Sequence, residues 1–88
     1  MQEQRLFTTS QELQDVLTHV LGFSKGREVG QIVTYMKMEN NELIAALYLP
    51  KQGNRLIGDR ELRAYCDEIA VSLPEMWGYI ITLRAAHS

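Results

Sequence analysis

The fold is decided by residues 29–50, VGQIVTYMKMENNELIAALYLP, which have the pattern of two strands joined by a tight turn. Both halves, 29–38 and 42–49, are rich in β-branched and aromatic residues, which is typical of strands. Asn40 and Asn41 tolerate the positive φ angles that a tight hairpin turn needs. Pro50 ends the second strand, because proline has no N–H to donate to a strand ladder. The stretch therefore predicts an antiparallel pair.

The segment before the hairpin, TTSQELQDVLTHVLG at 8–22, predicts a helix. Thr9 and Glu12 have the spacing of a capping box, and Gly22 is a natural C-cap. The preceding residues, RLFTT, either form a short strand or remain irregular, and the sequence leaves both open. The apolar stripe of the helix follows the spacing i, i+3, i+4, i+7 and i+8 and consists of Leu13, Val16, Leu17, Val20 and Leu21.

A second helix is predicted after the hairpin. It begins near Asp59, a good N-cap after Gly58, and Pro74 stops it. The last segment, MWGYIITLR at 76–84, is predicted to be a strand by residue type, with Gly78 at a bulge. The apolar stripe expected for this second helix is Leu62, Tyr65, Cys66, Ile69 and Leu73.

These elements predict one α+β domain over residues 1–88. Two helices with one apolar stripe each pack most simply on one face of an antiparallel sheet, as a two-layer sandwich. The expected order is (β)αββαβ. With RLFTT as a strand the order is ferredoxin-like, and without it the order resembles that of BolA-like and type II KH domains.

The segment QGNRLIGDRELRAY at 52–65 is also similar in outline to BolA-like proteins, which have a glycine-containing turn, a basic segment and then a helix. Asp59 and Arg60 stand where that family has its characteristic histidine beside arginine. The GXXG loop of KH domains is absent from the sequence. The resemblance therefore concerns topology, and it implies no function for this chain.

Charge and cysteine content limit the class of protein. The formal charge is −2, whereas domains that mainly neutralise phosphates usually carry a clear basic excess. The one cysteine, Cys66, forms no internal disulfide, and no apolar run approaches the ~18 residues that span a bilayer. The N-terminal residues lack the apolar region of a signal peptide. We therefore expect a cytoplasmic protein without membrane contact, of a size that fits a bacterial or phage accessory protein.

Both faces of the predicted sheet are apolar, although the helices can cover only one of them. A contiguous exposed apolar patch usually marks an interface, so the open face is predicted to bind a protein. Two alternatives stay open: tyrosine is common at half-exposed strand positions, and a shift of one residue in register would exchange the faces. The residues expected to contact a partner are Val33, Tyr35, Ile44, Tyr48, Trp77 and Tyr79.

No set of residues has the spacing of a catalytic or metal site. His19 and His87 have no Cys, Asp or Glu at ligand spacing, so no metal is predicted. Cys66 lies on the inner face of a predicted helix without a histidine to activate it, which is typical of a core residue. We expect no enzymatic activity, no cofactor and no small-molecule substrate.

The polar stretch at 51–63 has two interpretations. It forms a secondary surface for an anion or nucleic acid at a helix N-terminus, or it is a solvated loop whose arginines are offset by Asp59 and Glu61. The second is favoured, because Asp59 as N-cap would occupy the N–H groups that an anion needs. The basic residues concerned are Lys51, Arg55, Arg60 and Arg63.

The sequence thus predicts a non-catalytic binding or regulatory protein that acts through protein–protein contacts on its open sheet face, as a homodimer or in a partner complex. The alternative is a single-stranded nucleic-acid-binding module that stacks bases on the sheet aromatics, as RRM domains do, and adds the Lys51–Arg63 loop. The hairpin strands are not basic and lack the RNP1 pattern, which favours protein binding.

Overall fold

The computed structural model describes residues 7–87, and these form an α+β fold, as predicted. The two elements at the start are β1 (Thr8–Thr9) and α1 (Ser10–His19). The middle of the chain forms β2 (Ser24–Val29), β3 (Ile32–Glu39), β4 (Glu42–Pro50) and β5 (Leu56–Ile57). Two helices follow, α2 (Asp59–Ile69) and α3 (Leu73–His87). Of the segment RLFTT, only the last two residues form a strand, and its first two lie outside the described residues.

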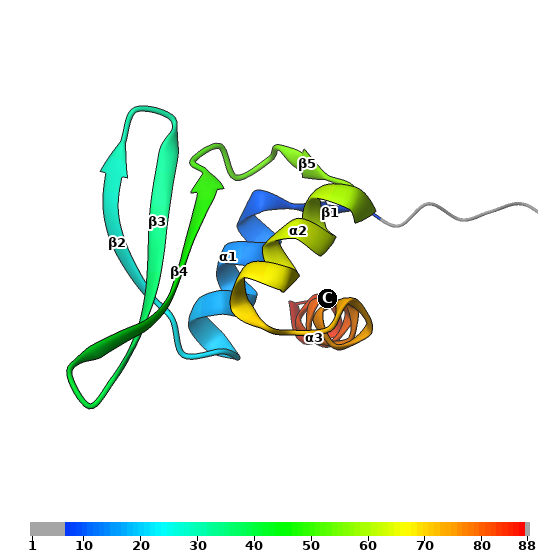
Figure 1. The fold of residues 1–88 in the computed structure, drawn as a ribbon. Coiled ribbons are helices and arrows are strands. Elements are labelled where there is room, and N and C mark those ends of the chain that lie inside the picture. Colours follow the sequence, from blue (N-terminus) through cyan, green and yellow to red (C-terminus); the bar gives the residue numbers. More distant parts are fainter. Residues whose placement is uncertain (1–6, 88) are drawn as a thin grey trace, which may run out of the picture.

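The strands form two antiparallel sheets, a three-stranded one in the order β2-β3-β4 and a small pair of β1 with β5. Helices α1 and α2 pack on one face of the three-stranded sheet, and α3 lies beyond them, on the side away from the sheet (Figure 1). No helix in residues 7–87 is long and apolar enough to cross a membrane. The ferredoxin-like or BolA/KH-II-like order and the two-layer arrangement are not confirmed. The described chain has three helices, and it ends with α2 and α3 where the prediction has one helix and a last strand.

The hairpin turn is confirmed. Glu39 pairs with Glu42, and Asn40 and Asn41 between them have φ angles of 53° and 66°. These are the left-handed values that a tight two-residue hairpin turn requires, and asparagine adopts them more readily than most residues do.

A β-bulge close to the turn decides which side chains share a face. Met38 pairs with Leu43, but Lys37 pairs with Ala45, so Ile44 has no residue opposite it in β3. The extra residue shifts the register by one, which places Leu47 opposite Tyr35. A regular two-residue hairpin would instead have placed Tyr35 opposite Ala46.

The prediction placed four hairpin residues on the open face, Val33, Tyr35, Ile44 and Tyr48, and it is wrong for the first two. Val33 is 1% exposed and Tyr35 is 3% exposed, and both lie on the face that the helices cover. Leu47 and Leu49, their partners across the ladder, are buried with them. Two residues on one strand with two on the next form the sheet side of the core.

A strand that the sequence did not predict, β2, runs along the outer side of β3. Its sequence, SKGREV, has little strand preference, and only its pairing with β3 makes it a strand. Val29 is its last residue, and Gly30 takes a φ of 60° in the turn to β3. The prediction that one strand begins at Val29 is thus wrong, and β3 begins at Ile32.

The capping box of α1 is confirmed. The Thr9 hydroxyl accepts the N–H of Glu12 at 3.1 Å, and the Glu12 carboxylate accepts the N–H of Thr9 at 3.3 Å. The helix ends earlier than predicted, with Val20 as C-cap, and Gly22 takes its φ of 76° in the turn that follows. The N-cap of α2 is Gly58 rather than Asp59, which is the first residue of that helix.

The predicted last strand, MWGYIITLR, is wrong, because these residues form the middle of α3. Met76, Trp77 and Ile80 are buried at the helical spacing i, i+1 and i+4, and this packing overrides the strand preference of the residue types. Pro74 does not stop α2. It lies in the first turn of α3, where a missing N–H costs nothing, and α2 ends instead at Ala70 in the left-handed region with a φ of 57°.

A buried chain of hydrogen bonds joins α1 to the hairpin. The Tyr35 hydroxyl donates to Gln14 Oε1 at 2.7 Å, and Gln14 Nε2 donates to Ser10 Oγ at 3.0 Å. Ser10 Oγ donates in turn to the carbonyl oxygen of Pro50 at 2.6 Å. Each of the polar groups in this series of hydrogen bonds is paired. The series therefore fixes the position of α1 on the sheet without leaving a buried polar group unpaired.

Candidate protein-binding surface

The face of the β2-β3-β4 sheet that points away from the helices is apolar and uncovered. It is on the left-hand side of the molecule in Figure 1. We call it the open face, and its members in the described chain include Ser24, Val29, Ile32, Thr34, Met36, Met38, Leu43, Ile44, Ala46, Tyr48 and Pro50. Ile32 and Ile44 are each 49% exposed, and Tyr48 is 63% exposed. The expectation of an open apolar sheet face thus holds for a changed set of residues.

The distribution of charge on β3 and β4 is the reverse of the usual one. An antiparallel sheet with one solvated face normally carries polar side chains there. Here β3 and β4 contribute no charged side chain to the open face, whereas Lys37 points to the helix side, with its ammonium 6.0 Å from the centre of the Phe23 ring. The part of the open face that β3 and β4 form therefore has the composition of a buried surface.

The predicted contact residues do not lie on one surface. Ile44 and Tyr48 are on the open face, but Val33 and Tyr35 are buried on the other side of the sheet. The remaining two are on α3, far from the sheet.

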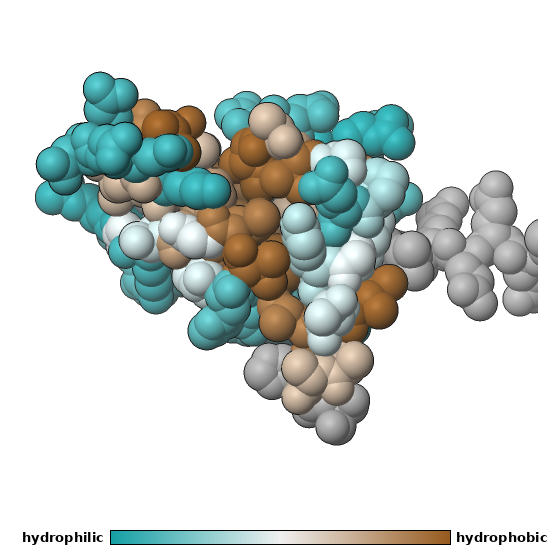
Figure 2. All heavy atoms as spheres, turned by 90° about the horizontal axis from the view of Figure 1, so that it is seen from below, coloured by the Kyte–Doolittle hydropathy of each residue, from teal (hydrophilic) through white to brown (hydrophobic). Residues whose placement is uncertain are grey.

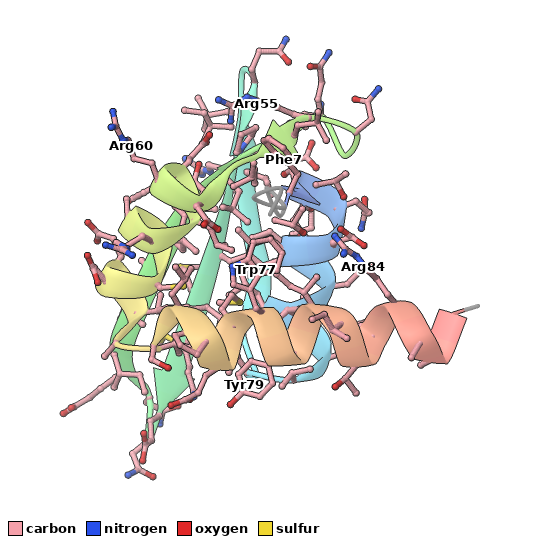
Figure 3. All side chains as sticks on the ribbon, turned by 90° about the vertical axis from the view of Figure 1, so that its right-hand side faces the viewer. Phe7, Arg55, Arg60, Trp77, Tyr79 and Arg84 are labelled. Atoms are coloured by element: carbon pink, nitrogen blue, oxygen red, sulfur yellow. The ribbon has the colours of Figure 1, made fainter. Side chains whose placement is uncertain are left out.

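Trp77 and Tyr79 have structural partners. Trp77 is 8% exposed, and its indole N–H donates to Asp59 Oδ1 at 3.2 Å, which ties α3 to the start of α2 (Figure 3). The Tyr79 hydroxyl lies 3.5 Å from a Glu75 carboxylate oxygen, one turn away on the same helix. Neither side chain is part of the sheet surface.

Apart from Ile44 and Tyr48, the members of the open face were not predicted as contacts. In β3, Ile32 and Met36 stand at the positions that alternate with Val33 and Tyr35, and either set is apolar enough to be the core. The bulge at Ile44 decides which β4 side chains join each of these sets, and the run LIAAL gives no sign of where an extra residue lies. The apolar character of both faces was visible in the sequence, but the assignment of each face was not.

The basic stretch at 51–63 is not gathered into one site. Lys51 Nζ lies 3.2 Å from a Glu28 carboxylate oxygen. Arg55 contacts Glu61 at 2.8 Å, and this pairing raises the pKa of the guanidinium. Two of the four predicted cations are thus neutralised by acids, as the loop interpretation of the sequence expects.

The Arg55–Glu61 pair extends to Tyr65, whose hydroxyl donates to Glu61 at 2.8 Å. Burial, together with the bond to this carboxylate, raises the pKa of Tyr65 to about 12. Arg60 and Arg63 line a shallow depression of about 260 Å³ with Asp59, and no ion pair to either arginine is present in residues 7–87.

A second apolar area lies on the underside of the molecule. Figure 2 shows hydrophobic residues gathered between the sheet and α3, beside the polar tip of the hairpin. The partly buried residues that pack at the ends of the helices include Leu21, Val71 and Leu73, with the more exposed Val20. Most of these side chains are half-covered by the core, so this area exposes less of each side chain than the open face does.

The described residues contain no group of three His, Cys, Asp or Glu side chains that could hold a metal ion. Cys66 is buried against Leu62 and the rest of the core, and burial raises the pKa of its thiol. A raised pKa reduces the thiolate fraction at neutral pH, so the position suits packing better than nucleophilic chemistry.

Comparisons with protein-family models, with curated proteins and with solved structures found no match to this chain.

Proposed function

We propose that this chain is a non-catalytic binding protein, with a regulatory role, that acts through protein–protein contacts on its open face, as a homodimer or in a partner complex. The observation that carries the proposal is the uncharged, apolar composition of β3 and β4 on the side away from the helices. The lone, buried Cys66 needs no oxidising compartment, so the proposal places the protein in the cytoplasm.

Burial of the open face would favour formation of a complex. Complete burial of a side chain such as Ile or Met is worth roughly 1.5–3 kcal/mol, and half-exposed side chains recover part of that on binding. The open face combines several such side chains with one aromatic, Tyr48, and tyrosine is enriched among residues that dominate binding energies. A partner that excludes water from this face would thus gain several kcal/mol.

The alternative is a single-stranded nucleic-acid-binding module. One observation favours it: Tyr48, on the edge strand β4, presents an exposed ring on the open face. Stacking of several bases needs more than one ring, and Tyr35 and Trp77 are buried elsewhere. Charge also supports the protein partner, because Arg55 and Lys51 are engaged by acids.

The proposal is tested by a matched pair of substitutions. Ile32→Lys places a charge on the open face, and Ile81→Lys places the same charge on α3, where Ile81 is 53% exposed against 49% for Ile32. Self-association is measured by light scattering, and partner capture is measured by pull-down from the native host. We expect Ile32→Lys to weaken the contact made by the open face, whether with a partner or with a second copy, at least roughly tenfold, and Ile81→Lys to leave that contact unchanged.

Two results would contradict the proposal. Equal loss with both variants would point to a general effect of charge, and equal retention would show that the open face makes no contact. Retention of the unmodified protein on an oligonucleotide column, with strong salt dependence, would favour the alternative instead.

A further inference from the structure

The two edges of the β2-β3-β4 sheet differ in how they are protected. The β2 edge carries Lys25, Arg27 and Glu28, and its register shifts between Lys25 and Glu28. Charges and bulges of this kind prevent an edge strand from pairing with another chain. The β4 edge has no charged residue from 43 to 49, a run of LIAALYL.

The β4 edge is also free of backbone partners. No strand lies beside it in the sheet order, and within the described chain residues 43–49 make no backbone hydrogen bond outside the β3–β4 ladder. An unprotected apolar edge of this length is a template for a further strand. The β2 edge is thus protected against pairing with a further strand, and the β4 edge is not.

A groove of about 330 Å³ runs between β4 and α2. It is lined by residues 46–48 of β4 and by Ala64, Tyr65 and Glu68 of α2. Successive strand residues point to opposite faces, so three in a row line one groove only along the edge of the strand. The groove therefore shows that this part of α2 lies next to the free edge of β4.

The exposed ridge of α2 beside the groove carries Arg60, Ala64 and Glu68, which are spaced i, i+4 and i+8. Arg60 extends into solvent on the side of the molecule where β4 lies (Figure 3). Arg60 and Glu68 are about 12 Å apart along the helix, too far to pair with each other. Neither has an ion-pair partner in the described chain.

The order of these two charges opposes the helix dipole. A cation near the N-terminus and an anion near the C-terminus are each unfavourable for an isolated helix. The order is, however, self-complementary: an antiparallel copy of the ridge brings each arginine opposite a glutamate, with Ala64 at the centre. A small central residue allows two helices to approach to the roughly 8 Å at the close end of helix packing.

We propose that a second copy of this chain pairs with the free edge of β4. A two-fold axis perpendicular to the sheet passes near Ala46 and Leu47 and near Ala64, which the groove places at the same level. Each β4 then runs antiparallel to its counterpart and extends the three-stranded sheet to twice its width. Arg60 faces Glu68 of the partner subunit on both sides of the axis.

This dimer goes beyond the proposed function and uses a different surface. A two-fold axis perpendicular to the sheet keeps both open faces on one side, where they form one continuous apolar surface. The edge contact and the open-face contact can therefore fail independently.

The test is an exchange of the two charges. Sedimentation equilibrium over a wide concentration range measures dimerisation of the unmodified protein and of Arg60→Glu, Glu68→Arg and the double variant. Each single variant places like charges opposite each other twice, and we expect roughly tenfold weaker dimerisation. The double variant restores opposite charges, and we expect it to return to within about threefold of the unmodified protein.

Arg63→Glu is the matched control, because it makes the same charge change on an exposed site of α2 that lies off the ridge. It should leave dimerisation unchanged, and circular dichroism confirms that each variant is folded. A monomer at every concentration, single variants that dimerise normally, or a double variant that fails to recover would overturn the proposal. Dissociation by Ile32→Lys with no effect of the charge variants would overturn it while supporting the open face as the contact.

Discussion

The two faces of the three-stranded sheet are almost equally apolar, yet only one of them belongs to the core. On the helix side, Leu47 and Leu49 are 2% and 1% exposed, whereas Tyr48 between them is 63% exposed. Hydrophobicity alone therefore does not tell which side of a strand folds inward. On this chain the covered face should determine stability and the open face should determine binding, and substitutions on adjacent residues can separate the two roles.

The largest expected effect is on the covered face. Leu47→Ala removes a fully buried side chain opposite Tyr35 and leaves a cavity, which should lower the free energy of unfolding by about 2–5 kcal/mol. Urea unfolding followed by circular dichroism measures the change. A loss below about 1 kcal/mol would show that α1 and α2 do not hold this face closed.

A smaller effect is expected from the buried hydrogen bonds on the same face. Tyr35→Phe keeps the ring but removes the hydroxyl that donates to Gln14 Oε1 at 2.7 Å. The amide oxygen is then buried without this donor, so we expect a loss of about 1–3 kcal/mol in the free energy of unfolding. Adding Gln14→Leu should recover part of the loss, because the orphaned polar group is gone. A double variant that is less stable than Tyr35→Phe would contradict this explanation.

The pH dependence of stability tests how α3 is held against α1, the helix that packs on the covered face. Arg84 Nε donates to Glu12 Oε2 at 2.6 Å, and Arg84 Nη2 donates to Glu12 Oε1 and to the carbonyl oxygen of Phe7, both at 2.7 Å. The bond to Arg84 is the main cause that lowers the pKa of Glu12 below 4.5. Because its pKa is lower in the folded state, the ionised Glu12 carboxylate stabilises the fold above pH 4.5. This stabilisation is lost as the pH falls through the folded-state pKa.

Glu12→Gln is the matched variant for this pH effect, because glutamine keeps the capping box while it removes the charge. The pair is partly exposed, so the difference at pH 7 should not exceed about 1 kcal/mol. We expect the stability of the two proteins to converge between pH 5 and pH 3 in urea titrations. A constant difference across this range would mean that the charge of Glu12 is not what binds α3 to α1.

The comparison of the faces also shows how much of this fold the sequence contains. Local sequence was sufficient to predict the Asn40–Asn41 turn and the Thr9–Glu12 capping box, because each depends only on residues that are close together in the sequence. The strand β2 was missed since SKGREV becomes a strand only by pairing with β3. Residues 76–84 were assigned to a strand because they are apolar at nearly every position, so the helical spacing of Met76 and Ile80 was hidden among other hydrophobic residues.

The candidate surface was predictable as a property and not as a set of residues. The sequence shows that both faces of the hairpin are apolar, and one layer of helices can cover only one of them. Which side chains of β4 share a face with Val33 and Tyr35 follows from the position of one unpaired residue, Ile44, because a shift of one residue in register exchanges every side chain beyond it. The pattern of apolar residues is the same in either register, so it could not decide.

The smallest expected effect completes the comparison. Tyr48→Ala removes a larger side chain than Leu47→Ala does, but from the open face, where the ring already contacts water. Its free energy of unfolding should change by no more than about 0.5 kcal/mol, as is usual for surface positions. Partner capture or self-association measured on the same sample should nevertheless weaken, because the ring is the largest side chain on the open face. A loss of stability comparable to that of Leu47→Ala would mean that the ring supports the fold, and the division of roles between the two faces would no longer hold.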